Sequence, residues 1–321
     1  EKNEKCIIFF FFFNMEQYNI LFLFIFFNRE DIALKAFEMI RSVRPTRLYL
    51  SQDGPRIDRG EEEQRKLIRI RKHIIERIDW ECTVHQRFMN KNLGCAMGVK
   101  TAIDWIFETE KYGIILEDDC VVSKSFFPFM EDILVRYKDD QRIGMVAGTN
   151  PIEKYRGRTS FHFSRFKSCW GWATWARAWK NMDMDMTWRE TDMMSVINNS
   201  GFNSRHNSKW HFQLKCIDRN HVSAWDWQWY FSLAAQNQLC VYPAVNLVSN
   251  IGNDIEATHT SFGDITRERH ELPLPLTAPS IVAPDYHFDK MFDANENRLT
   301  TMLARIMPPT LKGYIKRLLN R

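Results

Sequence analysis

Three consecutive carboxylates, Glu117, Asp118 and Asp119, are the side chains of this chain best placed to do chemistry. They follow residues 113–116 (GIIL), an apolar run that predicts a buried strand. The acids then fall at the carboxyl end of that strand, which is the edge of an open α/β sheet where ligands bind. Carboxylate oxygens suit Mg²⁺ or Mn²⁺, and such ions commonly bridge a protein to phosphates. The alternative is a solvated acidic turn.

A fourth carboxylate, Asp226, stands in the segment Trp225-Asp226-Trp227-Gln228-Trp229. Apolar surroundings raise the pKa of a carboxyl group, which suits a general base. The alternative is an aspartate that accepts a hydrogen bond from an indole N–H. Further on, His259 lies in a predicted loop. A histidine there can complete a metal shell, although most single loop histidines are not ligands.

Two more polar residues follow predicted strands. Arg29 comes just after the apolar run Asn19–Phe27, and Asp53 comes just after the run Arg47–Ser51. An arginine at a strand end can bind a phosphate or a base, and an aspartate there can accept hydrogen bonds from a base or ribose. The alternatives are a surface arginine and an aspartate that forms the Asp-Gly-Pro turn.

These residues are positioned by alternating strand and helix patterns in the first half of the chain. Further strands are predicted at 82–87 and 143–147, and helices at 33–40, 61–77, 96–108 and 125–137. We also expect Asp31 to cap the first helix. This alternation predicts an α/β fold with a mostly parallel central sheet. The second half adds a strand at 239–242 and four tryptophans within residues 170–179, which are typical of a core or of a groove lining.

The bulk composition excludes several classes of protein. The 321 residues are 26% charged and 45% hydrophobic, which is typical of a globular protein, and the net charge of +4 argues against a nucleic-acid binder. Seven cysteines without a CxxC pair indicate reduced thiols and a cytoplasmic protein. No apolar stretch reaches the roughly 20 residues of a membrane helix. The basic segment from Leu311 predicts an amphipathic helix that contacts a membrane surface or packs on the protein.

Taken in order, these motifs resemble the nucleotide-sugar glycosyltransferases of the GT-A fold. The resemblance is to the N-acetylglucosaminyltransferase I type and to bacterial relatives termed hemolytic-protein-like, and it covers roughly residues 18–262. The motifs that carry it are Asn28-Arg29, Ser51-Gln52-Asp53-Gly54, the acidic strand end 115–119, Ser125-Phe126-Phe127, Gly171-Trp172, Trp225-Asp226, and the stretch from Pro243 through Asn250-Ile251-Gly252 to His259.

The resemblance implies a donor site in the first half of the chain. Asp119 would bind a divalent metal, Mn²⁺ or Mg²⁺, that holds the donor diphosphate. Glu117 and Asp118 would contact the ribose and the donor sugar. Arg29 and Asp53 would line the nucleotide pocket, which would take uridine.

The resemblance implies an acceptor site in the second half. Asp226 would deprotonate the acceptor hydroxyl, although this chain has Asp226-Trp227 where the relative has two adjacent acids. Trp172 and Trp225 would form an aromatic platform for the acceptor. His259 would lie where related enzymes place a residue that contacts the metal or the phosphate.

The predicted organisation is one two-lobed domain of the GT-A type with helices on both faces of the sheet. Residues 1–14 would be a disordered or non-native extension, 15–148 the nucleotide-sugar half, 149–285 the acceptor and catalytic half, and 286–321 a basic helical tail.

The predicted function is a metal-dependent, inverting transfer of a hexosyl or N-acetylhexosaminyl group from a UDP-sugar. The acceptor would be a glycan or glycolipid, built from the cytoplasmic side in polysaccharide biosynthesis. Three alternatives stay open. One is a sugar-phosphate nucleotidyltransferase, against which the lack of glycine in residues 28–31 counts. The others are a glycoside hydrolase that uses Asp119 and Asp226, and a non-catalytic nucleotide- or glycan-binding protein.

Overall fold

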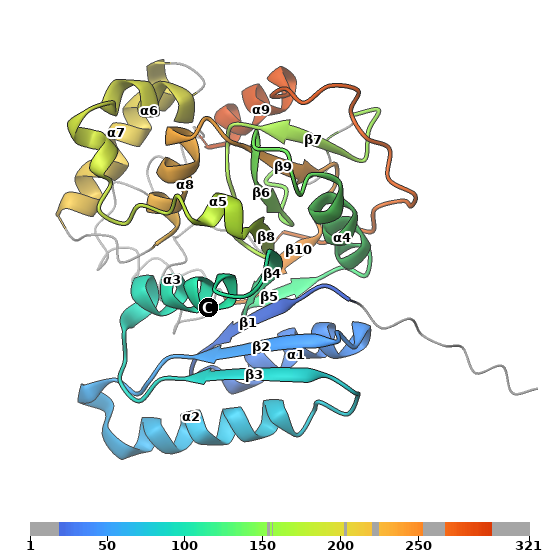
Figure 1. The fold of residues 1–321 in the computed structure, drawn as a ribbon, viewed down its shortest axis with the longest axis vertical. Coiled ribbons are helices and arrows are strands. Elements are labelled where there is room, and N and C mark those ends of the chain that lie inside the picture. Colours follow the sequence, from blue (N-terminus) through green and yellow to red (C-terminus); the bar gives the residue numbers. More distant parts are fainter. Residues whose placement is uncertain are drawn as a thin grey trace, which may run out of the picture.

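The computed structural model describes residues 19–152, 155, 157–201, 204–219, 225–252 and 267–296. Its centre is an eight-stranded sheet with the strand order β3-β2-β1-β4-β8-β6-β9-β7 (Figure 1). The strands of this sheet are β1 Phe22–Phe26, β2 Arg47–Gln52, β3 Thr83–Phe88, β4 Tyr112–Glu117, β6 Ile143–Ala147, β7 Phe161–Ser164, β8 Trp172–Trp175 and β9 Leu239–Pro243.

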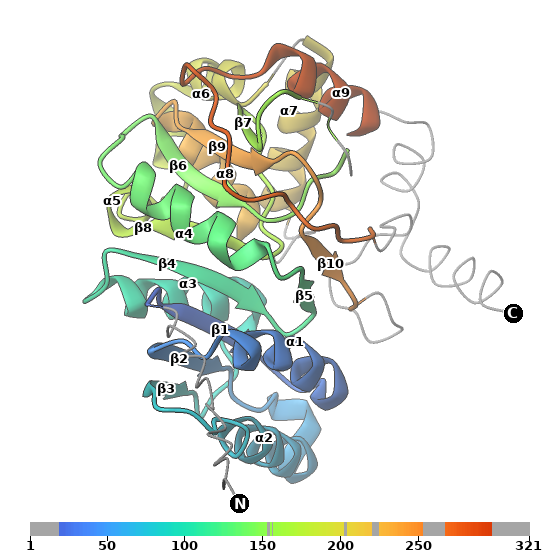
Figure 2. The same cartoon turned by 90° about the vertical axis from the view of Figure 1, so that its right-hand side faces the viewer.

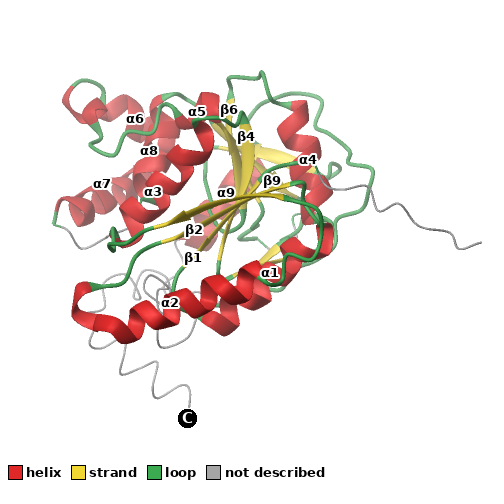
Figure 3. Cartoon of the chain, turned by 60° about the horizontal axis from the view of Figure 1, so that its bottom comes forward, coloured by secondary structure: helices red, strands yellow, loops and turns green. Residues whose placement is uncertain are grey.

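Helices cover both faces of the sheet (Figure 3). The helices are α1 Glu30–Val43, α2 Gly60–Ile75, α3 Gly94–Phe107, α4 Phe126–Arg136, α5 Ala176–Trp179, α6 Met193–Ser200, α7 Ser204–Asp218, α8 Asp226–Ala235 and α9 Tyr286–Glu296, with 3-10 turns at Ile57–Arg59 and Thr187–Glu190. The predicted α/β architecture, a mostly parallel sheet between two helical layers, is confirmed.

The apolar run of β1 shows why this sheet is buried on both sides. Phe22, Phe24 and Phe26 point into the core beneath α1, α2 and α4, while Leu21 and Leu23 point into the core beneath α3 and the second-half helices. Alternate residues of a strand face opposite sides, so a strand covered on both faces must be apolar throughout. The continuous hydrophobic run in the sequence is the consequence.

Two of the eight strands run against the others. β8 is antiparallel to its neighbours β4 and β6, and β7 is antiparallel to β9. A separate two-stranded ribbon pairs β5 Cys120–Val122 with β10 Val248–Asn250, and Figure 2 shows it beside α1. β6, from the first of the two predicted halves, lies between β8 and β9 of the second half. One sheet therefore runs through both halves.

The structure corrects one detail of the sequence analysis and adds others. Asp31 does not cap α1, because the helix begins at Glu30 and Arg29 occupies the cap position without a side-chain cap bond. The segment 183–208, for which no element was predicted, contains α6 and the start of α7. Residues 1–14, the segment from Leu311 and His259 lie outside the described residues.

None of the helices in the described part of the chain is long and apolar enough to cross a membrane. The six cysteines that the structure describes are free thiols.

One histidine in the core is expected to make the fold sensitive to acid. His162 on β7 is 3% exposed and packs against Phe288 of α9, with 3.9 Å between the ring centroids. Burial lowers the pKa of His162 from 6.5 to about 3. Near pH 5 the unfolded chain therefore binds a proton at His162 and the folded chain does not, so the contribution of His162 to stability falls as the pH drops from about 6.5 towards 3.

We expect His162→Phe to flatten the acid limb of the stability profile. At pH 5 the unprotonated histidine costs the folded state about 2 kcal/mol relative to neutral pH, and phenylalanine does not titrate. Urea unfolding of both proteins at pH 5 and 7.5 measures the difference, and His85→Phe on β3 controls for the change of ring. An equal loss of stability on acidification in His162→Phe and wild type would contradict this assignment.

Candidate active site

The acidic motif lies at the point where the order of the parallel strands reverses. From β1 the chain proceeds to β2 and β3 on one side, and then to β4 on the other side of β1. The crevice between the carboxyl ends of two such strands is the usual ligand site of an open α/β sheet. Arg29 follows β1 by three residues, Glu117 is the last residue of β4, and Asp118 and Asp119 come directly after it, so both motifs lie at this switch point.

The guanidinium of Arg29 neutralises two of the three acids. Its Nη2 donates to Asp118 Oδ1 at 2.5 Å and to Asp119 Oδ2 at 3.0 Å. The backbone N–H of Phe27 also donates to Asp118 Oδ2 at 3.1 Å. Asp118 is 6% exposed, so the motif is not a solvated turn. No local pattern in the sequence predicts this ion pair, which forms because β1 and β4 are parallel neighbours.

The third acid, Glu117, is not one of the two that pair with Arg29, and its carboxyl group is mostly protonated at neutral pH. Burial raises the pKa of the Glu117 carboxyl to about 8, and the carboxylates of Asp119, Asp118 and Asp226 raise it in addition. Burial also raises the pKa of Asp118 to about 6, and Arg29 opposes that rise. These carboxyl groups are thus crowded into a site of low polarity, where a further positive charge would be stabilising.

The chain that leads towards His259 is anchored on the acidic turn. The backbone N–H of Ile251 donates to the backbone oxygen of Asp119 at 2.8 Å. A Cβ atom at Gly252 would overlap Asp119 Oδ2 and Arg29 Nη1. Only a residue without a side chain allows the backbone to pass this close to the ion pair. The Asn250-Ile251-Gly252 motif therefore covers the site on this side.

Asp53 holds the start of a helix. Its carboxylate accepts hydrogen bonds from the backbone N–H groups of Leu93, at 2.9 Å, and Gly94, at 3.0 Å. A Cβ atom at Gly98 would lie 3.4 Å from Asp53 Oδ2, so α3 packs directly on this carboxylate. Asp53 Oδ1 also accepts a hydrogen bond from the backbone N–H of Gly54 at 2.8 Å, within the Asp-Gly-Pro segment. They fix α3 against the end of β2.

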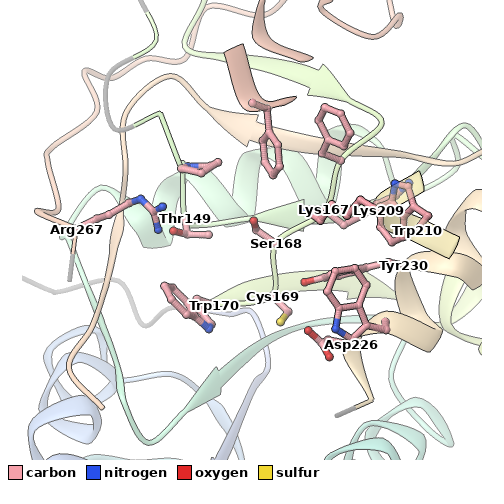
Figure 4. A pocket seen from close by; sticks show the side chains of 14 residues that line it. Thr149, Lys167, Ser168, Cys169, Trp170, Lys209, Trp210, Asp226, Tyr230 and Arg267 are labelled. Carbon is pink, nitrogen blue, oxygen red and sulfur yellow. The ribbon is translucent and has the colours of Figure 1, made fainter. Parts of the chain in front are cut away.

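Asp226 is the first residue of α8 and lines a pocket together with Cys169, Trp170 and Tyr230 (Figure 4). Its Oδ1 is shielded from solvent and has no hydrogen-bond partner among the described residues. Burial raises the pKa of the Asp226 carboxyl to about 6. A carboxylate with a raised pKa in the lining of a pocket is a candidate general base.

The thiol of Cys95 shows that the predicted carboxylates come together. Cys95 lies in the first turn of α3, and burial raises its pKa to about 12. Glu117, Asp226, Asp119 and Asp53 each raise it further. Carboxylates from the ends of β2 and β4 and from the start of α8 are therefore all within electrostatic reach of one atom. The structure brings these four predicted residues to one site, and Arg29 joins them through the acidic turn.

The two predicted platform tryptophans lie behind the site. Trp172 on β8 is fully buried and Trp225 is 3% exposed, and their rings stack at 5.4 Å between centroids. The aromatic residues that line the pocket are others, and sequence reasoning did not single them out. They include Trp170, Trp210 and Trp227. Trp170 is, however, one of the four tryptophans within residues 170–179 for which a groove lining was one of two predicted roles. Its neighbour Gly171 has a φ of +56° at the bend before β8.

The described residues do not form a metal shell by themselves. They contain no group of three His, Cys, Asp or Glu side chains placed to hold one ion. Asp119 offers carboxylate oxygens, the donor type that Mn²⁺ and Mg²⁺ prefer, but its Oδ2 accepts a hydrogen bond from Arg29. A cation at Asp119 would need further ligands, such as diphosphate oxygens.

Comparison with known proteins yields no family model and no curated relative that matches the chain. Several solved structures are similar at a low level, and three of them are described here. HddC from Yersinia pseudotuberculosis has 12% identity and a TM-score of 0.27, over 40% of this chain and 56% of its own. A putative glucose-1-phosphate thymidylyltransferase from Bacillus anthracis has 9% identity and a TM-score of 0.33, over 56% and 82%. The glycosyltransferase GlyE from Streptococcus pneumoniae has 11% identity and a TM-score of 0.29, over 71% and 54%.

The chain thus spans little more than half the length of HddC and of GlyE. Similarity at these TM-scores does not indicate a function for this chain.

We expect removal of the Arg29 guanidinium to destabilise the fold strongly. Arg29→Met leaves two largely buried carboxylates without their partner, which costs about 3 kcal/mol. Adding Asp118→Asn should recover part of that loss. Arg136→Met is the matched control, because its pair with Asp132 lies on the surface and is worth less than about 1 kcal/mol. Urea unfolding measures all four proteins, and equal costs for Arg29→Met and Arg136→Met would refute the buried pair.

Proposed function

We propose that this protein is a glycosyltransferase that moves a sugar from a nucleotide-diphosphate donor, a UDP-sugar, to a hydroxyl of a glycan or glycolipid. The observation that carries the proposal is the position of Arg29 and its ion pairs with Asp118 and Asp119 at the switch point between β1 and β4, together with the pocket that Asp226 lines. Charged groups at the strand ends and a pocket that contains a carboxylate suit transfer between two substrates.

The donor would bind at the strand ends. Arg29 and the acidic turn border the crevice between β1 and β4, and Asp53 stands at the end of the next strand. We assign the nucleotide and donor sugar to this crevice, with Arg29, Asp53, Glu117 and Asp118 as contacts.

A divalent cation would bind together with the donor, because the described residues do not supply enough ligands by themselves. Asp119 is the residue that we assign to it, and the diphosphate would complete its ligands. Bound there, Mn²⁺ or Mg²⁺ would neutralise the charge of the leaving diphosphate. The oxygen donors of the acidic turn suit such an ion, and its charge would be stabilising beside Glu117.

Asp226 would act as the general base. Its carboxylate would accept the proton of the acceptor hydroxyl as that oxygen attacks the donor sugar. A base and a leaving group on opposite sides of the sugar give inversion, which we propose here. The raised pKa of about 6 makes the carboxylate a stronger base than an ordinary aspartate and keeps it ionised at neutral pH.

We expect metal-dependent binding of UDP. Calorimetric titration of UDP into the protein with Mn²⁺ should show saturable binding that EDTA abolishes and that Asp119→Ala lowers at least about tenfold, since a lost charged contact costs more than 1.4 kcal/mol. Asp132→Ala on the surface of α4 is the control. If folded protein bound no UDP, GDP or CMP with either metal, the donor site and the transferase proposal would both fall.

We expect Asp226→Asn to lose transfer and keep donor binding. The rate of transfer from a panel of UDP-sugars to glycoside acceptors should fall roughly thousandfold, since asparagine cannot take a proton. In the unsubstituted protein kcat/KM should rise as the pH increases through about 6 and then level off. Asp58→Asn, at an exposed site, is the control. Full transfer by Asp226→Asn would exclude Asp226 as the base, and sugar release without a nucleotide would favour a hydrolase.

A further inference from the structure

The pocket that contains Asp226 is lined by more positive than negative side chains, which binding of a neutral sugar does not require. It has a volume of about 220 Å³ and lies between the connection from β7 to β8 and the helices α7 and α8 (Figure 4). Its described lining includes three cations, Lys167, Lys209 and Arg267, against the single carboxylate of Asp226. With Asp226 ionised, the formal charge of these four side chains is +2, that is, three positive charges and one negative.

Lys167 is the most unusual of the three cations. It is 6% exposed, and no described residue accepts a hydrogen bond or forms an ion pair with it. Burial lowers the pKa of Lys167 to about 8. The buried carboxylate of Asp289 is a charged group of opposite sign near Lys167: its Oδ1 accepts a hydrogen bond from Ser164 at 2.6 Å, and its Oδ2 has no partner among the described residues. The Arg165 cation acts against the charge of Lys167.

A buried ammonium without a partner is costly, and the cost is relieved when an anion binds to it. Lys167 belongs to the pocket lining, so a ligand in the pocket can reach it. Asp289 compensates the charge of Lys167 only from a distance, so an anion in the pocket would stabilise that charge further.

The rest of the lining suits a sugar ring. Trp170 and Trp227 are half-buried and Trp210 is 4% exposed, so indole surface borders the cavity. The ammonium of Lys209 lies 6.0 Å from the ring centroid of Trp227. In Figure 4 Asp226 stands at the lower edge of the pocket, with Lys167 and Lys209 above it. The pocket thus combines aromatic faces, a base and cations.

We propose that the acceptor is an acidic sugar, whose carboxylate or phosphate group binds to Lys167 while Asp226 faces the hydroxyl that reacts. This inference rests on the proposed function and names its substrate class. The cations belong to the acceptor side, because Lys167 lies in the connection between β7 and β8, whereas the donor residues lie at the ends of β1, β2 and β4. Lys209 and Arg267 add positive potential that attracts such an acceptor.

The test uses three ring-matched probes: glucuronic acid, glucose 6-phosphate and glucose. Tryptophan fluorescence of the full chain is titrated with each, with and without saturating UDP and Mn²⁺. We expect at least one acid to bind about tenfold or more tighter than glucose, since its anionic group forms a charge-assisted bond that glucose lacks. Preference for glucuronic acid identifies a carboxylate ligand, and preference for glucose 6-phosphate identifies a phosphate.

Lys167→Met should abolish the preference for acidic sugars over glucose. Lys180→Met is the control: Lys180 is the exposed residue directly after α5, and its removal should leave the preference unchanged. If Lys167→Met does not fold, Lys209→Gln takes its place and should lower the preference. Equal binding of acids and glucose, no response to either acid, or an unchanged preference in the variant would overturn the inference. So would loss of acid binding on addition of UDP, because the cations would then serve the donor diphosphate.

The two proposals fail separately. Metal-dependent UDP binding and a requirement for Asp226 in transfer, together with no preference for acidic probes, would leave the transferase and remove the acidic acceptor. Absence of UDP binding would remove the transferase itself.

Discussion

The ion pair of Arg29 with Asp118 and Asp119 is the interaction on which the site depends. Three adjacent carboxyl groups at the end of a strand cannot be buried unless their charge is compensated, because ions lose their hydration in the interior. Arg29 compensates two of them from the neighbouring strand end. The parallel pairing of β1 with β4 is what brings the guanidinium and the acids to the same place.

The neighbouring backbone packs closely against this ion pair. β10 pairs with β5 directly after the acidic turn, and Gly252 brings the backbone against Arg29 and Asp119. On the other side, α3 begins at hydrogen bonds to Asp53 and presents Cys95 to the carboxylates. The site is thus built from strand ends and a helix start, which hold side chains more firmly than a long loop does.

The second half of the chain contributes the pocket whose lining includes positively charged side chains. β8 inserts antiparallel between β4 and β6, and its Trp172 stacks on Trp225, the residue before α8. This stacking places Asp226 at the border between the acidic crevice and the pocket that contains Lys167. Negative groups then gather at the strand ends and positive groups in the pocket, so the two sides of Asp226 are suited to ligands of different charge. An uncharged indole layer beneath both sides strengthens these electrostatic differences, because it excludes water.

The sequence by itself determined the strands of the first half, the mostly parallel sheet and the position of the acidic motif at the end of a strand. Apolar runs that end in polar residues are local signals, and a strand buried on both faces leaves such a run whatever its neighbours are. Only the tertiary structure decided which motifs meet. The pairing of Arg29 with Asp118, 89 residues apart, depends on strand order, and strand order is not written in any local pattern. The same holds for Trp172, which is core because β8 enters the sheet beside β4, and for Lys167, whose burial follows from the packing of α7, α8 and α9 around the end of β7. Charge and burial at these positions are properties of the assembled sheet, since each arises from residues far away in the chain.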